Sequence, residues 1–214
     1  MYKTVIFDFD YTLGDSTGGI VQSANYALAR LGFEESSVGE IKKTVGLTLK
    51  ETFHALTGAP EDSKAARFAD LFREKADIVM TDNTILYSDT TKVLRELSRL
   101  GIKTGIVTTK FHYRIDAVLR KFDAERLVGV VVGGEDVAAA KPDPEGLFKA
   151  IKALGVDKRD VLYIGDSLVD ARTAQAAGVD FAAVLTGTTD DFSEYNCVFI
   201  GKDLSEILNF VIKI

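Results

Sequence analysis

Six short apolar runs, rich in β-branched residues, recur along the 214-residue chain and constrain its fold more than any other feature. They cover residues 4–9, 102–107, 128–132, 161–164, 181–185 and 197–200. Runs this short, apolar on both faces, are typical of strands in a parallel sheet that helices cover on both sides. Because helical patterns lie between them, the chain is predicted to be an α/β protein with a doubly wound, Rossmann-like parallel-sheet core.

Residues that begin and end helices punctuate the segments between these runs. Leucines at positions 94, 97 and 100 share one helical face, and Gly101 follows them as a stop. Asp143 is a predicted N-cap, Pro144 occupies the first helical position, and Gly155 is predicted to close that helix.

Residues 16–86 break the alternation, because they contain consecutive helical patterns and no convincing strand. Helices are predicted over residues 20–31, 48–58 and about 62–80. The second of these begins with a capping box of Thr48 and Glu51. A helical cap domain is therefore predicted to be inserted after the first strand; the cap takes residues 16–86, and the α/β core takes residues 1–15 and 87–214.

The composition excludes several classes of partner. A formal net charge of -6, without a block of basic residues, argues against nucleic acid or an anionic membrane surface. The N-terminal apolar run is shorter than a signal-peptide core of roughly 7 to 15 residues, and no stretch approaches the ~20 apolar residues of a membrane span. The single cysteine, Cys197, is expected in the core of a reduced, cytoplasmic protein.

Reactive side chains follow four of the predicted strands. Ligands of open parallel sheets bind beyond the carboxyl ends of the strands. The positions concerned are Asp8 and Asp10, Thr108, Lys141 in the segment that follows Gly133 and Gly134, and Asp166 with Asp170. Taken singly, Asp166 is more typical of a helix N-cap, Thr108 of a strand, Lys141 of a solvated loop, and Asp170 of a first helical turn. Together, at one edge of one sheet, they predict a functional site.

Four carboxylates at one edge would repel one another unless a cation neutralised them. Mg²⁺ binds through one or two carboxylates together with water and substrate phosphate, which suits this small set of oxygen ligands. Lys141 supplies a compact positive charge for a phosphate oxygen, and the Thr108 hydroxyl adds a hydrogen bond. The sequence therefore predicts a magnesium site that also binds phosphate.

The four motifs, in this order, resemble those of the haloacid dehalogenase-like hydrolase superfamily. They are Asp8-Phe-Asp-Tyr-Thr-Leu-Gly-Asp-Ser16, Thr108, Lys141-Pro-Asp-Pro144 and Gly165-Asp-Ser-Leu-Val-Asp170. The resemblance covers essentially the whole chain and is to the phosphatase branch with a helical cap. Phosphoglycolate phosphatases and β-phosphoglucomutases belong to that branch.

The resemblance implies a role for each of these positions. Asp8 would attack phosphorus, and Asp10 would protonate the leaving oxygen and later activate water. Asp8, the backbone carbonyl of Asp10, and Asp166 would hold Mg²⁺, and Asp170 would orient metal-bound water. The transferring phosphoryl group would be held by Thr108, Lys141 and backbone N–H groups around Phe9 and Thr109.

Asp10 also separates two reaction classes. A halide leaves without a proton, whereas an alkoxide leaving phosphate needs one, so an acid at this position favours phosphoryl transfer over dehalogenation. Tyr11 departs from the resembling pattern, in which glycine is common. Either the backbone at Tyr11 keeps an ordinary φ or the residue is held under local strain.

Four further residues are weaker candidates. The segment 45–50 matches a loop that often faces the active site in the resembling family, so Gly46 and Lys50 are predicted to help select the substrate. His112 could reach the mouth of the site, although a surface histidine at a helix start is the simpler interpretation. His54 is expected to be structural or exposed.

These observations predict a Mg²⁺-dependent phosphatase that acts on a small phosphorylated metabolite through an aspartyl-phosphate. Phosphoglycolate is the best single substrate, with sugar phosphates and pyrophosphate next. A phosphomutase of the β-phosphoglucomutase type is an alternative, and a phospho-receiver or binding module is an alternative outside enzymes. The protein is expected to be a monomer or homodimer.

Overall fold

A computed structural model describes residues 2–60 and 62–213 of the chain. The chain divides into two compact units, one formed by Met1–Gly14 and Leu86–Ile214 and the other by Asp15–Ile85. Residues 1, 61 and 214, which the predicted domains include, lie outside the described residues.

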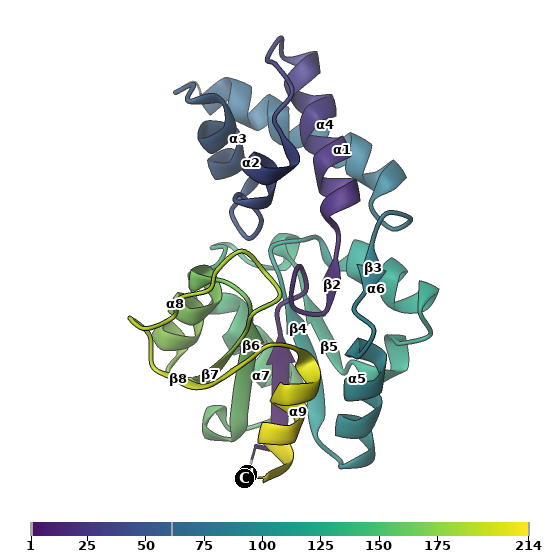
Figure 1. The fold of residues 1–214 in the computed structure, drawn as a ribbon, viewed down its shortest axis with the longest axis vertical. Helices are drawn as coiled ribbons and strands as arrows, with labels where there is room; N and C mark the ends of the chain where they lie inside the picture. Colours follow the sequence, from purple (N-terminus) through teal and green to yellow (C-terminus); the bar gives the residue numbers. More distant parts are fainter. Residues whose placement is uncertain (1, 61, 214) are drawn as a thin grey trace. The chain divides into compact units, whose positions relative to one another are not determined.

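A six-stranded parallel sheet forms the centre of the first unit, which we call the core unit (Figure 1). Its strands are β1 (Thr4–Phe7), β4 (Lys103–Val107), β5 (Val130–Val132), β6 (Val161–Gly165), β7 (Asp180–Val184) and β8 (Cys197–Gly201). They lie in the order β5-β4-β1-β6-β7-β8, and each neighbouring pair is parallel. Each of the six apolar runs overlaps one of these strands and differs from it by at most two residues at either end, which confirms the predicted α/β fold.

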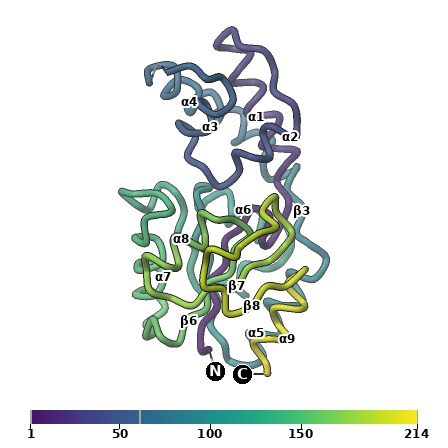
Figure 2. The backbone as a smooth tube through the Cα atoms, turned by 60° about the vertical axis from the view of Figure 1, so that its left-hand side comes forward, coloured from purple at the N-terminus to yellow at the C-terminus, as the bar shows by residue number. Residues whose placement is uncertain are grey.

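Helices cover both faces of this sheet. One face is covered by α5 (Thr90–Arg99), α6 (His112–Lys121) and α9 (Leu204–Lys213), the other by α7 (Glu145–Leu154) and α8 (Leu168–Ala177). Because side chains alternate along a strand, Val5 and Phe7 of β1 join the first cluster, and Ile6 joins the second. The helices α5 and α9, distant in sequence, lie side by side (Figures 1 and 2).

The register of the sheet brings the strand ends level with one another. Phe7 of β1 pairs with Ile106 of β4 on one side and with Ile164 of β6 on the other. Asp8 and Thr108 therefore leave the sheet at the same edge, as the pattern predicted. Short 3-10 helices lie at Glu125–Leu127, Gly134–Asp136 and Lys158–Asp160.

The helix signals hold with two corrections. The helix predicted over residues 20–31 begins three residues earlier and runs over Thr17–Arg30. Gly155 closes α7 in the left-handed region, with φ of 63°. The helix begins at Glu145, one residue later than predicted, so Pro144 precedes its first turn. The carboxylate of Asp143 accepts a hydrogen bond from the backbone N–H of Glu145 at 2.9 Å and shapes a turn there.

The second unit, which we call the helical unit, consists mainly of helices. It contains α1 (Thr17–Arg30), α2 (Val38–Lys42), α3 (Leu49–Thr57) and α4 (Asp62–Val79). Helices α1 and α4 pack along each other, and the aromatic rings of Phe53, Phe68 and Phe72 fill the core. The capping box of Thr48 and Glu51 is confirmed, with its reciprocal bonds at 3.2 and 2.9 Å.

Two features were not predicted. The five-residue helix α2 begins with a second capping box, formed by Ser37 and Glu40. The strands β2 (Gly14–Asp15) and β3 (Ile85–Leu86) form a separate two-stranded sheet, too short for a hydrophobic pattern to reveal. Over the described residues, no helix combines the length and apolar character needed to cross a membrane.

Candidate active site

The end of β1 places two aspartates inside the core unit. Asp8 follows the last strand residue directly, and its backbone N–H donates to the carbonyl of Ile164 at 2.8 Å. The fractional exposure is only 4% for Asp8 and 8% for Asp10. Since a buried carboxylate is unfavourable without compensating partners, both residues must be held by specific neighbours.

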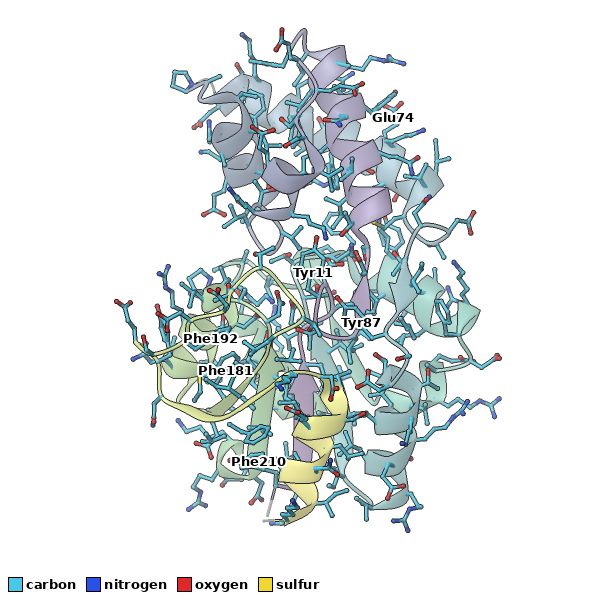
Figure 3. The ribbon with its side chains drawn as sticks, in the orientation of Figure 1. Tyr11, Glu74, Tyr87, Phe181, Phe192 and Phe210 are labelled. Atoms are coloured by element: carbon cyan, nitrogen blue, oxygen red, sulfur yellow. The ribbon has the colours of Figure 1, made fainter. Side chains whose placement is uncertain are left out.

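The turn after Asp10 is tight and strained. Tyr11 has a φ of 59°, in the left-handed region, which settles the two alternatives for this position in favour of strain. Such a conformation costs a non-glycine residue roughly 1 to 3 kcal/mol. The hydroxyl of Thr186 donates to the carbonyl of Tyr11, and the backbone N–H of Tyr11 donates to the carbonyl of Gly14 at 2.8 Å. The packed side chain of Tyr11 is labelled in Figure 3.

Lys141 reaches the nucleophile position from the loop that precedes α7. Its ammonium donates to Asp8 Oδ1 at 2.8 Å and to Asp170 Oδ1 at 2.7 Å. Burial of Lys141 acts to lower its pKa, but the carboxylates of Asp170 and Asp8 outweigh that effect and hold the pKa well above its ordinary value. Lys141 is therefore a permanent cation between two carboxylates.

Asp170 is fully buried and is fixed by several donors at once. Besides Lys141, the phenol of Tyr163 donates to Asp170 Oδ1 at 2.9 Å, and the hydroxyl of Ser167 donates to Oδ2 at 2.6 Å. Ser167 is the N-cap of α8, and Asp170 completes its capping box. The start of α8 thus holds this carboxylate in contact with Lys141.

Three buried carboxylates offer a site for a metal ion. Asp8, Asp166 and Asp170 can each present one oxygen so that all three atoms lie within 4.8 Å of one another. Burial, followed by the nearby negative charges, raises the pKa of Asp166, and burial also raises the pKa of Asp8 despite Lys141. Excess negative charge in a low-dielectric site, presented by hard oxygen atoms, fits a hard divalent cation.

Asp10 forms a second buried ion pair, apart from the first. Its Oδ2 lies 3.0 Å from the ammonium of Lys110, whose side chain is 6% exposed. Its Oδ1 is buried and has no hydrogen-bond partner among the described residues. The backbone N–H of Lys110 donates to the hydroxyl of Thr108 at 3.2 Å, which links this pair to the end of β4.

The chain matches a family model over residues 5–184, and the family is described as haloacid dehalogenase-like hydrolase. This chain belongs to the haloacid dehalogenase-like hydrolase family.

Curated relatives extend the match over nearly the whole chain. A phosphoglycolate phosphatase of Cereibacter sphaeroides is 34% identical over 86% of this chain and 85% of its own length. The pyrophosphatase PpaX of Bacillus pumilus is 31% identical over 98% of this chain and 96% of its own. A crystal structure described as a haloacid dehalogenase-like hydrolase from Bacteroides fragilis is 42% identical, with a TM-score of 0.93, and covers 97% of this chain and 100% of that one.

In this haloacid dehalogenase-like protein the predicted core residues come together. Asp8 contacts Lys141, Lys141 contacts Asp170, and Asp166 can share a metal ion with Asp8 and Asp170. Thr108, Thr109 and Lys141 line one small cavity with Gly133 and Gly134, while Phe9 is buried beside Asp8. The catalytic, phosphate-binding and metal-binding roles of these residues stay predictions.

The predicted cap residues lie in the other unit. Lys50 pairs with Asp62 at 2.9 Å, with 59% of its side chain exposed, and Gly46 has a φ of 92°. Their suggested part in substrate selection stays a prediction. His54 contacts the carbonyl of Ala59 through Nδ1 at 2.6 Å, in keeping with a structural role.

His112 has a local partner outside the aspartate cluster. It is the first residue of α6, and its Nδ1 lies 2.7 Å from Asp136 Oδ2. That carboxylate raises the pKa of the His112 imidazole. These contacts support the simpler interpretation, a histidine at a helix start.

Sequence reasoning assigned no role to four further residues of the site. Lys110 pairs with Asp10, Tyr163 donates to Asp170, and the hydroxyl of Thr12 donates to Asp166 Oδ1 at 3.3 Å. A Cβ added to Gly187 would overlap the carboxylate of Asp166, so the loop after β7 closes on that side chain. The sequence offered two signals for such residues. Tyr163 is a tyrosine within an otherwise apolar strand, and Gly187 is a glycine shortly after a strand.

Proposed function

We propose that the protein is a Mg²⁺-dependent phosphatase that hydrolyses a small phosphate monoester through an aspartyl-phosphate on Asp8. The observation that carries this proposal is the buried Asp8 carboxylate at the end of β1, bonded to Lys141 at 2.8 Å and grouped with Asp166 and Asp170. Membership of a hydrolase family and relatives named as phosphatases support the same reaction class.

In the first half-reaction, an Asp8 oxygen attacks phosphorus and the bond from phosphorus to the leaving oxygen breaks. Asp10 gives its proton to that oxygen, so the alcohol leaves neutral. Lys141 keeps Asp8 oriented and, with the hydroxyl of Thr108, attracts the negative charge on the phosphoryl oxygens. This division needs two separately held aspartates, and the ion pairs of Asp8 and Asp10 with different lysines support it.

In the second half-reaction, water attacks phosphorus, Asp10 takes the proton of that water, and the bond to Asp8 breaks to release inorganic phosphate. Asp8 and Asp166, with the backbone carbonyl of Asp10, would hold Mg²⁺, and Asp170 would orient the surrounding ligands. A bound divalent cation would neutralise the phosphoryl oxygens and bring the two anions together.

Phosphoglycolate is the substrate we favour, because the 34% identical relative is named for it. Pyrophosphate is the second candidate, supported by the 31% identical relative that matches 98% of the chain. The cytoplasmic location expected from the lone Cys197 and the expected monomer or homodimer stay predictions.

A phosphate-release screen tests the proposal. The purified protein is incubated with phosphoglycolate, pyrophosphate, β-glucose 1-phosphate and p-nitrophenyl phosphate, each with Mg²⁺ and with a chelator. We expect Mg²⁺-dependent release of phosphate, with phosphoglycolate or pyrophosphate fastest. Isomerised glucose phosphate without released phosphate would indicate a mutase, and a stable phosphoprotein without turnover would indicate a receiver.

A further inference from the structure

Lys110 forms a buried ion pair with Asp10, the residue to which the proposed function assigns the leaving group. In the proposed function, Asp10 protonates the leaving oxygen, so that oxygen must approach the Asp10 carboxylate to within hydrogen-bond distance. Asp10 Oδ1 is buried without a partner among the described residues, whereas Oδ2 lies 3.0 Å from the ammonium of Lys110. A leaving oxygen bound at Oδ1 is therefore held by the same carboxylate whose other oxygen pairs with that ammonium.

The two buried lysines serve different carboxylates. Lys141 lies between Asp8 and Asp170, at the nucleophile, and its two contacts are 2.8 and 2.7 Å long. Lys110 has its ion pair with Asp10 and is held on a different loop. In the proposed function, Lys141 would therefore bind the transferring phosphoryl group. Lys110 would lie near the part of the leaving group that is attached to the leaving oxygen.

The backbone that carries Lys110 is firmly packed. Gly133 and Gly134 lie directly against it, and a Cβ at Gly134 would come within 2.5 Å of the carbonyl of Thr109. The carbonyl of Lys110 accepts a hydrogen bond from Gly134 at 3.0 Å. A cation held on such a loop is preorganised, so a substrate anion that binds to it loses little free energy in ordering the protein.

We propose that Lys110 binds a second anionic group on the leaving side of the substrate, so that the enzyme selects phosphate compounds whose leaving group is itself an anion. The inference rests on the proposed function and narrows its substrate class to small phosphocarboxylates and pyrophosphate. The carboxylate of phosphoglycolate is attached two bonds beyond the leaving oxygen, which brings it within reach of Lys110. The ammonium is a compact positive charge, which attracts the substrate anion while Lys110 keeps its pair with Asp10.

The test compares two substrates that differ in this one group. Phosphoglycolate carries a carboxylate where 2-hydroxyethyl phosphate carries a neutral hydroxymethyl group. The ratio of their kcat/KM values is measured with Mg²⁺ in the wild type, Lys110→Met and Lys110→Arg. Because both substrates are assayed on the same preparation, the ratio does not depend on the fraction of the variant that folds.

We expect the wild type to prefer phosphoglycolate, and Lys110→Met to lower the ratio about 10- to 100-fold, as loss of a charge-assisted hydrogen bond does. Lys110→Arg should keep most of the preference, because it keeps the charge. The matched control is Lys3→Met, which removes an exposed lysine from its 2.8 Å pair with Asp160 in the same unit and should leave the ratio unchanged.

Two results separate failure of this inference from failure of the proposed function. Turnover of both esters with an equal ratio in wild type and Lys110→Met would overturn the role of Lys110 alone, and would make Lys110 a structural partner of Asp10. A wild-type ratio near one would overturn it as well. No Mg²⁺-dependent phosphate release from either ester or from p-nitrophenyl phosphate would overturn the proposed function and this inference with it.

Discussion

The two units of the chain differ in whether their charged side chains are buried. The core unit buries charged side chains at the carboxyl edge of its sheet, namely Asp8, Asp10, Lys110, Lys141, Asp166 and Asp170. Among the described residues of the helical unit, the buried polar side chains are all hydroxyls: Ser16, Ser23, Thr44, Thr52 and Thr84. Its Lys50–Asp62 pair is 59% and 71% exposed.

This contrast explains why a functional site can be recognised in the core unit and not in the helical unit. Removing a charge from water is unfavourable by several kcal/mol unless partners compensate it. A cluster of buried charges therefore marks a place where function, rather than stability, has kept them. Exposed charges cost little to keep, so their positions in the helical unit carry little functional information.

The largest expected effect comes from removing the nucleophile. Asp8→Asn keeps the side-chain volume but replaces the attacking carboxylate by an amide, so phosphate release should fall by at least about 10⁴-fold. Circular dichroism should show an intact fold. Asp70→Asn, at an exposed aspartate of the helical unit, is the control and should retain wild-type turnover. Appreciable activity in Asp8→Asn would mean that another residue attacks phosphorus.

Removing Lys141 should affect both rate and stability. Lys141→Met leaves the buried carboxylates of Asp8 and Asp170 without their shared cation. We expect phosphate release to fall by about 10²- to 10³-fold, and the free energy of unfolding in chelator at pH 8 to fall by about 3 to 5 kcal/mol.

The matched variant in the helical unit is Lys50→Met, which breaks an exposed pair. Urea denaturation should show no resolvable change in its stability. Equal stability losses in Lys50→Met and Lys141→Met would remove the distinction between buried and exposed charge drawn above.

The comparison also indicates how far sequence alone could go. The strand ends were predictable because the motif residues adjoin apolar runs, and parallel register then brings Asp8, Thr108 and Asp166 to one edge. Lys110 and Tyr163 were given no role because their importance lies in partners distant in sequence, Asp10 and Asp170. A lysine after a strand has no local pattern that separates a buried ion pair from a solvated charge.

The helical unit was predictable in its helices but not in its function. Capping boxes and left-handed glycines are local signals, so the start and end of α3 follow from Thr48 and Gly58. The part that Gly46 or Lys50 plays depends on which surface a substrate meets, and no local pattern contains that information.

Mg²⁺ should alter the dependence of stability on pH. The pKa of Asp8 is raised from an ordinary 3.8 to about 7, and that of Asp166 to about 9, chiefly by burial. The folded state then holds protons that the unfolded state releases. Without metal, stability should therefore fall as pH rises from about 4 through those raised values.

Bound Mg²⁺ favours the ionised carboxylates, so its stabilising effect should grow over the same pH window. Thermal unfolding from pH 5 to pH 9, in Mg²⁺ and in chelator, measures the difference, which should reach about 2 to 3 kcal/mol at a metal concentration near 100 times Kd. Asp166→Asn should lose most of this stabilisation. Parallel curves in Mg²⁺ and chelator would argue against a metal site among these carboxylates.

The smallest expected effect concerns the loop after β7, where Gly187 lies against Asp166. The loop is anchored by Phe192, whose ring packs on Phe181 of β7 with centroids 6.0 Å apart (Figure 3). A Cβ at position 187 would overlap Asp166 Oδ2, so Gly187→Ala should displace that carboxylate and weaken Mg²⁺ binding about 10-fold, as loss of an orienting contact does.

The concentration of Mg²⁺ that gives half-maximal phosphate release measures this displacement. Gly39→Ala is the control, because a Cβ at that helical position meets nothing within 4 Å. It should leave the Mg²⁺ requirement unchanged and stabilise the helical unit slightly, by about 0.5 to 1 kcal/mol. If both variants keep the wild-type Mg²⁺ requirement, the contact of Gly187 with Asp166 does not hold a metal ligand in place. A rise confined to Gly187→Ala would instead show that close packing in the core unit holds the ligand in place.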